Sequence, residues 1–233
     1  MKLSVRLLGP LEVHGPDGPV HFTGARRRAV FALLALRTGR MVSRSALVDG
    51  LWGEDAPFTA TKTLQGHIAK VRKALAQAGA DGVLQTREPG YLLDITQVEV
   101  DVEVFDEHMR CGRPEAALRL YRGEPLADCP VEGWAGAEIV RLREALALAE
   151  ENHVAALCRD GRYAEAIGPL ERLVALYPLR ESLWELLMQA QHRAGRPGDA
   201  LRTYRRVRAL LVEEFGMEPG DALRRREAAV LAG

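Results

Sequence analysis

A short pattern of residues that recurs at a fixed offset constrains the fold of this chain more than any other feature. Gly-Arg-x-x-Glu/Asp-Ala occurs at residues 161–166 and again 34 residues later, at residues 195–200. A related Gly-Arg copy at residues 112–118 lies 49 residues before the first of these, because a loop containing Gly and Pro intervenes. Such self-similarity predicts stacked copies of one supersecondary unit.

The spacing of the copies identifies the unit. A period of 34 residues is that of the tetratricopeptide helix-turn-helix repeat. The apolar residues downstream also match, since Leu170 and Leu173 of one copy correspond to Tyr204 and Val207 of the other. A small Ala in each copy lets two helices pack closely, and such repeats bury their core by stacking. A plain helical bundle with a chance match is the alternative, and the matched positions favour true repeats.

Residues 1–96 have a different pattern, which begins with short strands. Leu3, Val5 and Leu7 alternate with polar residues, and the Pro-Asp-Gly-Pro turn at residues 16–19 precedes Val20 and Phe22. These features predict a small antiparallel sheet. From residue 97 onward the pattern is helical, and no strand is expected there.

Three helices and a hairpin follow the predicted sheet. The apolar periodicity indicates three helices. The first spans residues 25–37, the second begins after an N-cap at Ser43, and the third spans residues 59–77. Residues 83–86 and 91–95 then flank a short turn, which is typical of a β-hairpin. The predicted fold is an α+β winged helix-turn-helix domain over residues 1–96, followed by an all-α tetratricopeptide-like domain over residues 97–233.

The charge of the chain is divided between these two parts. The whole chain carries 32 basic and 32 acidic side chains, and a neutral protein would not be expected to bind phosphate. Residues 1–96, however, contain 13 basic and 8 acidic side chains, whereas residues 97–233 contain 19 and 24. The resulting net charges of +5 and −5 suggest two modules with different partners, although chance alone can produce a difference of this size.

The basic residues of the third helix bear most directly on whether the N-terminal part binds nucleic acid. At 100° per residue, Ile68, Val71 and Leu75 lie within about 40° of Leu64, so the four residues share one face. The opposite side carries Lys62, Gly66, Ala69 and Lys73, and no acid occurs between Asp55 and Asp81. A solvated basic face is the simpler interpretation of this helix alone, but its position as the third helix before a hairpin favours DNA binding.

Each candidate residue suits one kind of DNA contact. Gln can bond adenine and Lys can bond guanine in the major groove, and a small residue at 66 permits close approach. His67, Arg72 and Lys73 suit phosphates, Arg44 can add a phosphate contact at the start of the second helix, and Arg87 sits where a wing enters the minor groove. Arg26, Arg27 and Arg28 are equally consistent with a solvated face. The candidates from this reasoning are Arg44, Lys62, Gln65, Gly66, His67, Lys70, Arg72, Lys73 and Arg87.

Several segments in order resemble known families. Residues 62–75 and the Arg-Glu-Pro-Gly-Tyr at residues 87–91 resemble the third helix and wing of the OmpR/PhoB-type winged-helix family. The opening segments at residues 7–13 and 24–29 are similar to the Streptomyces antibiotic regulatory protein family. Three later segments resemble that family's bacterial transcriptional activation domain, at residues 101–105, 121–128 and 213–220. Ala69 and Gly66 depart from the OmpR/PhoB type, which often has Arg and Val at these positions.

The resemblance implies a transcriptional activator of a secondary-metabolite (antibiotic) gene cluster. Such a protein binds direct repeats of double-stranded DNA upstream of promoters, usually as a homodimer, and recruits RNA polymerase holoenzyme through its sigma factor and alpha subunit. Carried onto this chain, the family's helix contacts place Lys62, Thr63, Gln65, Gly66, Lys70 and Arg72 at or near DNA, with His67 on phosphate. The resemblance thus adds Thr63 to the candidates.

Other functions find little support in the sequence. No phosphate-binding loop, dinucleotide fingerprint, HExxH or GxSxG occurs, and the His and Cys residues are dispersed. We therefore expect no enzyme activity, no cofactor and no metal, no membrane span, and a cytoplasmic protein associated with the nucleoid. Helical packing is the favoured role of Trp134 and Trp184 over partner binding. The main alternative function is an adaptor that binds proteins and not DNA.

Overall fold

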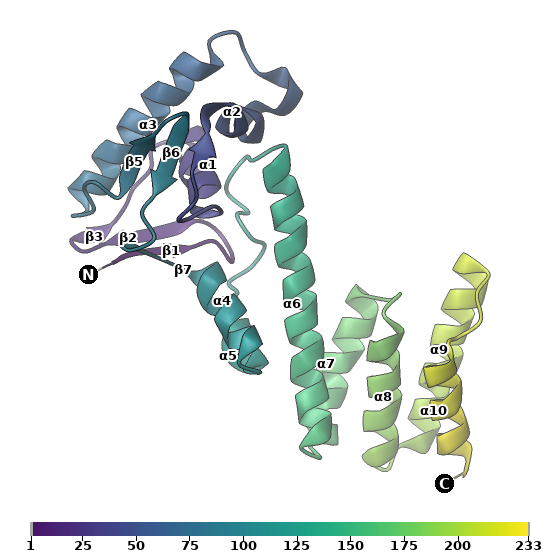
Figure 1. Ribbon diagram of the computed structural model, residues 1–233. Coiled ribbons are helices and arrows are strands. Elements are labelled where there is room, and N and C mark those ends of the chain that lie inside the picture. Colours follow the sequence, from purple (N-terminus) through teal and green to yellow (C-terminus); the bar gives the residue numbers. More distant parts are fainter. Residues whose placement is uncertain (1, 233) are drawn as a thin grey trace. The chain divides into compact units, whose positions relative to one another are not determined.

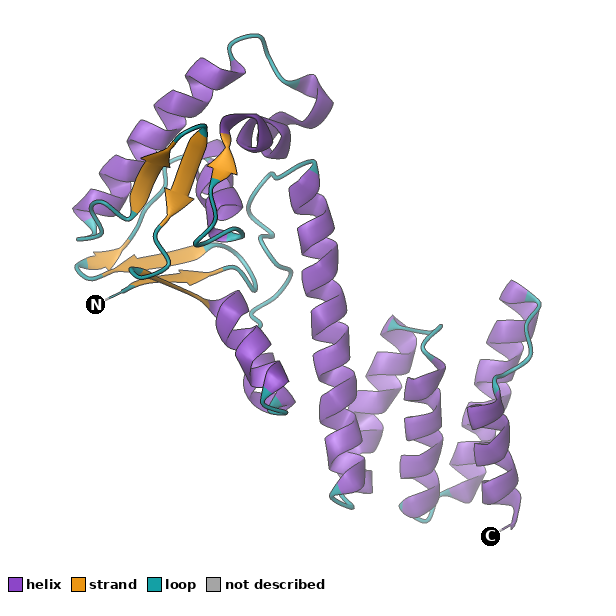
Figure 2. Ribbon diagram, viewed as in Figure 1, coloured by secondary structure: helices purple, strands orange, loops and turns teal. Residues whose placement is uncertain are grey.

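The computed structural model describes residues 2–232, which form two compact units that divide between Ala147 and Leu148 (Figure 1). Figure 2 shows strands in the first unit, whereas every regular element drawn in the second is a helix. The division lies well beyond the boundary predicted at residues 96 and 97, because residues 97–147 pack with the winged helix. The boundary at residues 96 and 97 divides the sequence by its pattern and not by compact structural units, and it stays a prediction.

The first unit contains a four-stranded sheet of order β3-β2-β1-β7. Val5 of β1 pairs with Val13 of β2 in antiparallel register and with Val100 of β7 in parallel register. The antiparallel sheet predicted near the N-terminus is confirmed for three strands. The bounds are β1 Leu3–Arg6, β2 Glu12–Gly15, β3 Gly18–Pro19 and β7 Val98–Val100.

Two details of the predicted strands were wrong. The third strand is Gly18–Pro19 and not Val20 to Phe22, because Phe22 turns away to pack on Phe31, with ring centroids 4.9 Å apart. The expectation of no strand after residue 97 fails at β7. Its alternating Val98, Glu99 and Val100 read as a strand only when β1 supplies the pairing edge.

Three helices and a hairpin complete the winged helix, as predicted, and an unpredicted strand, β4, extends the hairpin to a second sheet. The central α1 buries every residue from Ala29 to Ala35 and packs against α2 and α3. Ser43 is the N-cap of α2, as predicted, and its Oγ accepts a bond of 3.1 Å from the N–H of Ala46. The three-stranded sheet has the order β4-β6-β5. The bounds are α1 Ala25–Ala35, β4 Val42–Ser43, α2 Arg44–Trp52, the short 3₁₀ helix η1 Gly53–Asp55, α3 Ala60–Gln77, β5 Leu84–Arg87 and β6 Gly90–Leu93.

Asp101 joins the chain after β7 to the residues that directly follow β1. It is the first residue of α4 (Asp101–Arg110), and its carboxylate accepts bonds of 2.8 and 3.0 Å from the N–H groups of Leu7 and Leu8. Burial raises the pKa of Asp101, and the two N–H bonds oppose that shift. Because both N–H groups are buried, the carboxylate satisfies donors that would otherwise be left unpaired.

The segment after α5 (Pro114–Leu118), which we call the strap (residues 119–133), also packs on the winged helix. The N–H groups of Arg122 and Leu126 each donate 2.8 Å bonds, to the carbonyls of Leu8 and Gly9. Further along, the Glu132 N–H bonds the Gly50 carbonyl of α2 at 2.9 Å. The backbone of the strap is therefore bonded both to the loop between β1 and β2 and to α2.

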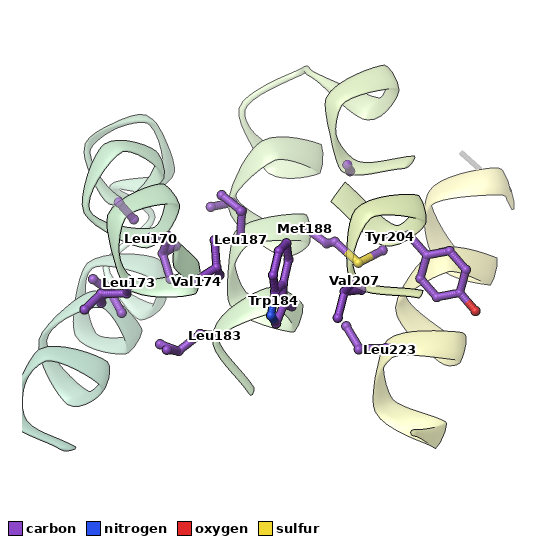
Figure 3. Packing of buried hydrophobic residues seen from close by; sticks show 14 of the residues in the cluster. Leu170, Leu173, Val174, Leu183, Trp184, Leu187, Met188, Tyr204, Val207 and Leu223 are labelled. Carbon is purple, nitrogen blue, oxygen red and sulfur yellow. The ribbon is translucent and has the colours of Figure 1, made fainter. Parts of the chain in front are cut away.

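The second unit consists of stacked helices around one apolar core (Figure 3). Trp184 lies in that core at 5% exposure, which confirms the packing role predicted for it, and its Nε1 donates to the Pro178 carbonyl at 2.9 Å. α7 packs on α8, α8 on α9, and α10 on both α8 and α9. The bounds are α6 Trp134–Arg159 (within which the units divide), α7 Tyr163–Leu176, α8 Glu181–Arg193, α9 Pro197–Phe215 and α10 Asp221–Ala232.

The repeated pattern has a direct structural explanation. The equivalent Ala117, Ala166 and Ala200 are all fully buried, which confirms the small residue expected in each copy. Each Gly of the pattern has a positive φ and ends a helix. The Gly N–H donates to the carbonyl three residues before it. The N–H of the following Arg donates to the carbonyl five residues before that Arg. This is the Schellman arrangement, which favours Gly because an L side chain is strained there.

Candidate nucleic-acid interface

The two faces of α3 are as predicted from its periodicity. Leu64, Ile68, Val71 and Leu75 are all at most 2% exposed and face the helical core. On the rest of the surface, His67 and Arg72 are half-buried. The remaining candidates of this helix are exposed: Lys62, Thr63, Gln65, Gly66, Lys70 and Lys73. Cationic and neutral polar groups therefore cover the outward face of α3.

Gly66 is the point at which this face has no side chain. A Cβ built on Gly66 would meet no atom within 4 Å, so nothing inside the protein requires Gly there. Gly in the middle of a helix costs up to ~1 kcal/mol relative to Ala. A cost without an internal cause suggests an external one, such as the close approach of a ligand's backbone or base.

Arg72 connects α3 to the wing formed by β5 and β6. Its Nε donates to the Leu84 carbonyl at 3.0 Å, and its Nη2 donates to the Thr86 hydroxyl at 2.7 Å. The guanidinium also lies over the ring of Tyr91, 5.8 Å from its centroid. Arg72 was predicted to contact phosphate, and in this structure its donors are used to position the wing.

Arg44, the first residue of α2, lies on the same ring. Its guanidinium is also 5.8 Å from the Tyr91 centroid, and it donates two parallel bonds to the Glu88 carboxylate, at 2.6 and 2.8 Å. The Arg44 N–H bonds the Pro89 carbonyl at 3.2 Å, which holds the wing tip at the start of α2. The fork of Arg44 lowers the pKa of Glu88, so the pair is ionised. We call Arg44, Arg72, Glu88 and Tyr91 the Tyr91 cluster.

Arg87 ends β5 and is exposed, with one bond of 3.0 Å from its Nη2 to the Gln85 side chain. Sequence reasoning placed Arg87 at the wing but missed Thr86 and Tyr91, which hold Arg72, and Glu88, which holds Arg44. The signal available for Glu88 was that it is the one acid within residues 84–93.

The three arginines at the start of α1 have separate roles. Arg26 donates to the Leu51 carbonyl and lies over the Trp52 ring, 5.4 Å from its centroid. Arg28 pairs with Asp128 of the strap at 3.5 Å. Arg27 is half-buried and contributes to the positive field around His67. Arg26 and Arg28 are therefore engaged within the unit, which agrees with leaving them out of the candidate set.

The surroundings of His67 favour the neutral form of its imidazole, because they lower its pKa. Desolvation lowers its pKa below the ordinary value of 6.5, and the cations Arg27, Lys70 and Arg26 lower it further. At neutral pH His67 is therefore mostly uncharged, and a neutral imidazole can donate one hydrogen bond.

Within residues 2–232, no three or more His, Cys, Asp or Glu side chains are grouped so as to hold a metal ion. No helix in the same range is both long and apolar enough to cross a membrane.

An exposed basic helix in a winged helix-turn-helix, followed by stacked helical repeats, defines a class of transcriptional regulator. Two family models match the chain accordingly. Residues 18–93 match the family described as "Transcriptional regulatory protein, C terminal", and residues 100–231 match the "Bacterial transcriptional activator domain". The chain belongs to the Streptomyces antibiotic regulatory protein family of transcriptional regulators.

Individual relatives agree with this assignment. The transcriptional regulator RedD of Streptomyces coelicolor is 37% identical over 99% of this chain and 71% of its own length. The regulatory protein DnrI of Streptomyces peucetius is 35% identical over 98% of this chain and 92% of its own. The solved structure of Mycobacterium tuberculosis EmbR, in complex with a low-affinity phosphopeptide, is similar with a TM-score of 0.87 and 32% identity; the match covers 99% of this chain and 65% of EmbR.

Proposed function

We propose that this chain activates transcription by binding promoter DNA with α3 in the major groove and the wing beside it. The exposed, acid-free face of α3 carries this proposal, because it presents only cationic, polar and small residues outside a fully buried stripe. Lys62, Gln65 and Lys70 are in place to read base edges, and Thr63 lies among them. Gly66 lets the helix approach closely.

Further residues would position the protein on the duplex. Lys73 and His67 flank the reading face and suit phosphates, and Arg87 on the wing suits the minor groove. Arg44 is the remaining phosphate candidate, and Arg72 acts by holding the wing against α3. These contacts carry affinity, whereas the base-edge contacts of α3 carry specificity.

The targets and partners follow from the family. We propose promoters of a secondary-metabolite gene cluster, bound at direct repeats by two copies of the chain, with RNA polymerase recruited through its sigma factor and alpha subunit. The net charge of −5 on residues 97–233 supports a protein partner for that part of the chain and not a nucleic acid. Repeats spaced by about 10–11 base pairs would place both copies on one side of the duplex.

Genome-wide footprinting of the bound sites, followed by mobility shift on the sites found, tests this function. We expect Lys70→Ala combined with Arg87→Ala to abolish the shift, whereas Arg193→Ala, an exposed cation of the second unit, should leave it unchanged. Affinity should fall steeply between 50 and 200 mM salt, by ~10³-fold or more if 6–10 phosphates are contacted. Retention of binding by the double variant would count against the proposed site, whereas binding to the target with little response to salt would favour the adaptor function instead.

A further inference from the structure

In the Tyr91 cluster, the carboxylate of Glu88 binds Arg44, which would have to be free in order to bind a DNA phosphate. Within residues 84–93 of the wing, Glu88 is the one acidic residue. It pairs with Arg44 although its own side chain is 72% exposed, while that of Arg44 is 28% exposed. An exposed ion pair contributes little to stability, so a need for folding does not explain this acid.

The geometry of the pair matches that of an arginine on a phosphate. Two oxygens of Glu88 accept two parallel bonds, at 2.6 and 2.8 Å, from the fork of the guanidinium. Arginine binds carboxylate and phosphate with this same fork. Glu88 therefore occupies the donors through which Arg44 would bind the DNA backbone.

Arg44 also has contacts that do not involve the Glu88 side chain. Its guanidinium lies over Tyr91, which is 5% exposed, and its N–H bonds the Pro89 carbonyl. Glu88 lies in the turn between β5 and β6 and is the more exposed partner, because most of its side chain is in solvent. A phosphate that reaches this site must displace Glu88 or leave Arg44 unused.

We propose that Glu88 is a built-in competitor of DNA phosphate for Arg44, which lowers the affinity of the chain for every DNA sequence. This inference rests on the proposed function and adds a residue that acts against binding. A phosphate contact carries no sequence information, so the competition weakens specific and non-specific binding by the same factor. Since the genome offers a vast excess of non-specific sites, weaker binding to them leaves more of the protein free to search.

The test is a double-mutant cycle of Glu88→Gln and Arg44→Gln, with binding measured by fluorescence anisotropy at several salt concentrations. Two labelled duplexes serve as probes: one selected by the wild-type chain from a random-sequence library, and one of mixed sequence without that site. Glu99→Gln, which removes an exposed acid from β7, is the matched control. Thermal unfolding of each variant checks that the fold is kept.

We expect Glu88→Gln to bind both duplexes roughly 3- to 10-fold more tightly and to steepen the salt slope by about 0.9, the value for one added phosphate contact. In the Arg44→Gln background the same change should have less than about a twofold effect and should not alter the slope. An equal gain in both backgrounds, or an equal gain from Glu99→Gln, would reduce Glu88 to a general negative charge and overturn the inference. So would unchanged affinity of Glu88→Gln. If the wild-type chain binds no duplex and selects none, the proposed function fails as well.

Discussion

The indole N–H of Trp134 donates a 2.9 Å hydrogen bond to the carbonyl of Ala46 in α2. The same ring carries the guanidinium of Arg37, 4.6 Å from its centroid. Trp134 begins α6 and so ends the strap, whereas α2 packs directly on α3. The first residue of α6 thus lies one helix away from the proposed DNA-reading helix, and residues predicted to belong to separate domains share one packed unit.

Replacing Trp134 should therefore weaken the winged helix. Trp134→Phe keeps the aromatic packing and removes the donor to Ala46, so we expect the free energy of unfolding to fall by about 1 kcal/mol. Chemical denaturation of the whole chain, followed by far-UV circular dichroism, measures this loss. Trp134→Ala should cost about 3 kcal/mol or more. An unchanged midpoint for both variants would show that Trp134 contributes nothing to the stability of the winged helix.

Asp101 should be sensitive to the loss of its charge. In Asp101→Asn one oxygen still accepts, but the amide NH₂ replaces the second acceptor and faces a buried N–H of Leu7 or Leu8. An unsatisfied buried donor costs about 1–3 kcal/mol, and the unfolding midpoint should shift accordingly. Glu103→Gln is the control, because it neutralises an exposed acid in the same first turn of α4. Equal shifts for the two variants would contradict the role given to Asp101.

Gly66→Ala should separate stability from DNA binding. Because the added Cβ meets open space within the protein, we expect a gain of up to ~1 kcal/mol in the free energy of unfolding. The same methyl group should weaken binding to a selected duplex if α3 approaches DNA at this point. Gly168→Ala in α7 is a matched control, since it also meets nothing within 4 Å and is remote from α3 in sequence. Tight DNA binding by a stabilised Gly66→Ala would remove Gly66 from the interface.

The affinity for DNA should increase as the pH falls through the titration of His67. In the free protein, desolvation and neighbouring cations lower the pKa of His67. A bound phosphate stabilises the imidazolium and raises that pKa, so binding takes up a proton. Affinity should then rise below the bound pKa and level off below the free pKa, by roughly tenfold for each pKa unit between them. Binding isotherms between about pH 5.5 and 8 measure this, and His67→Gln should flatten the profile. A wild-type profile that is already flat would place His67 away from phosphate.

The sequence was sufficient for features that depend on local periodicity. The buried stripe of α3 follows from apolar residues three and four apart, and the exposed candidates follow from the same geometry. The repeat was equally visible, because each Schellman turn needs its own Gly and each helix pair needs its own small Ala. Such features are set by neighbours along the chain.

Features that depend on distant partners could not be predicted in this way. Val98–Val100 becomes a strand through pairing with β1, which lies at the other end of the winged helix in sequence. The partners of Arg44 and Arg72 depend on how the wing folds back onto α2 and α3. From sequence alone, an arginine bound to a wing and an arginine free for phosphate look the same.

The parallel pairing of β1 with β7 has a consequence for the order of synthesis. One neighbour of β1, the strand β2, follows it directly along the chain, whereas its other neighbour, β7, is made only after the whole wing. Until then, the β1 edge exposes unpaired N–H and C=O groups, which is the usual template for wrong pairing. Since a nascent chain folds from its N-terminus, the DNA-binding half must wait for the beginning of the activator segment before its sheet can close. A chain that stops before Val98 would therefore leave the β1 edge of this sheet without its parallel partner.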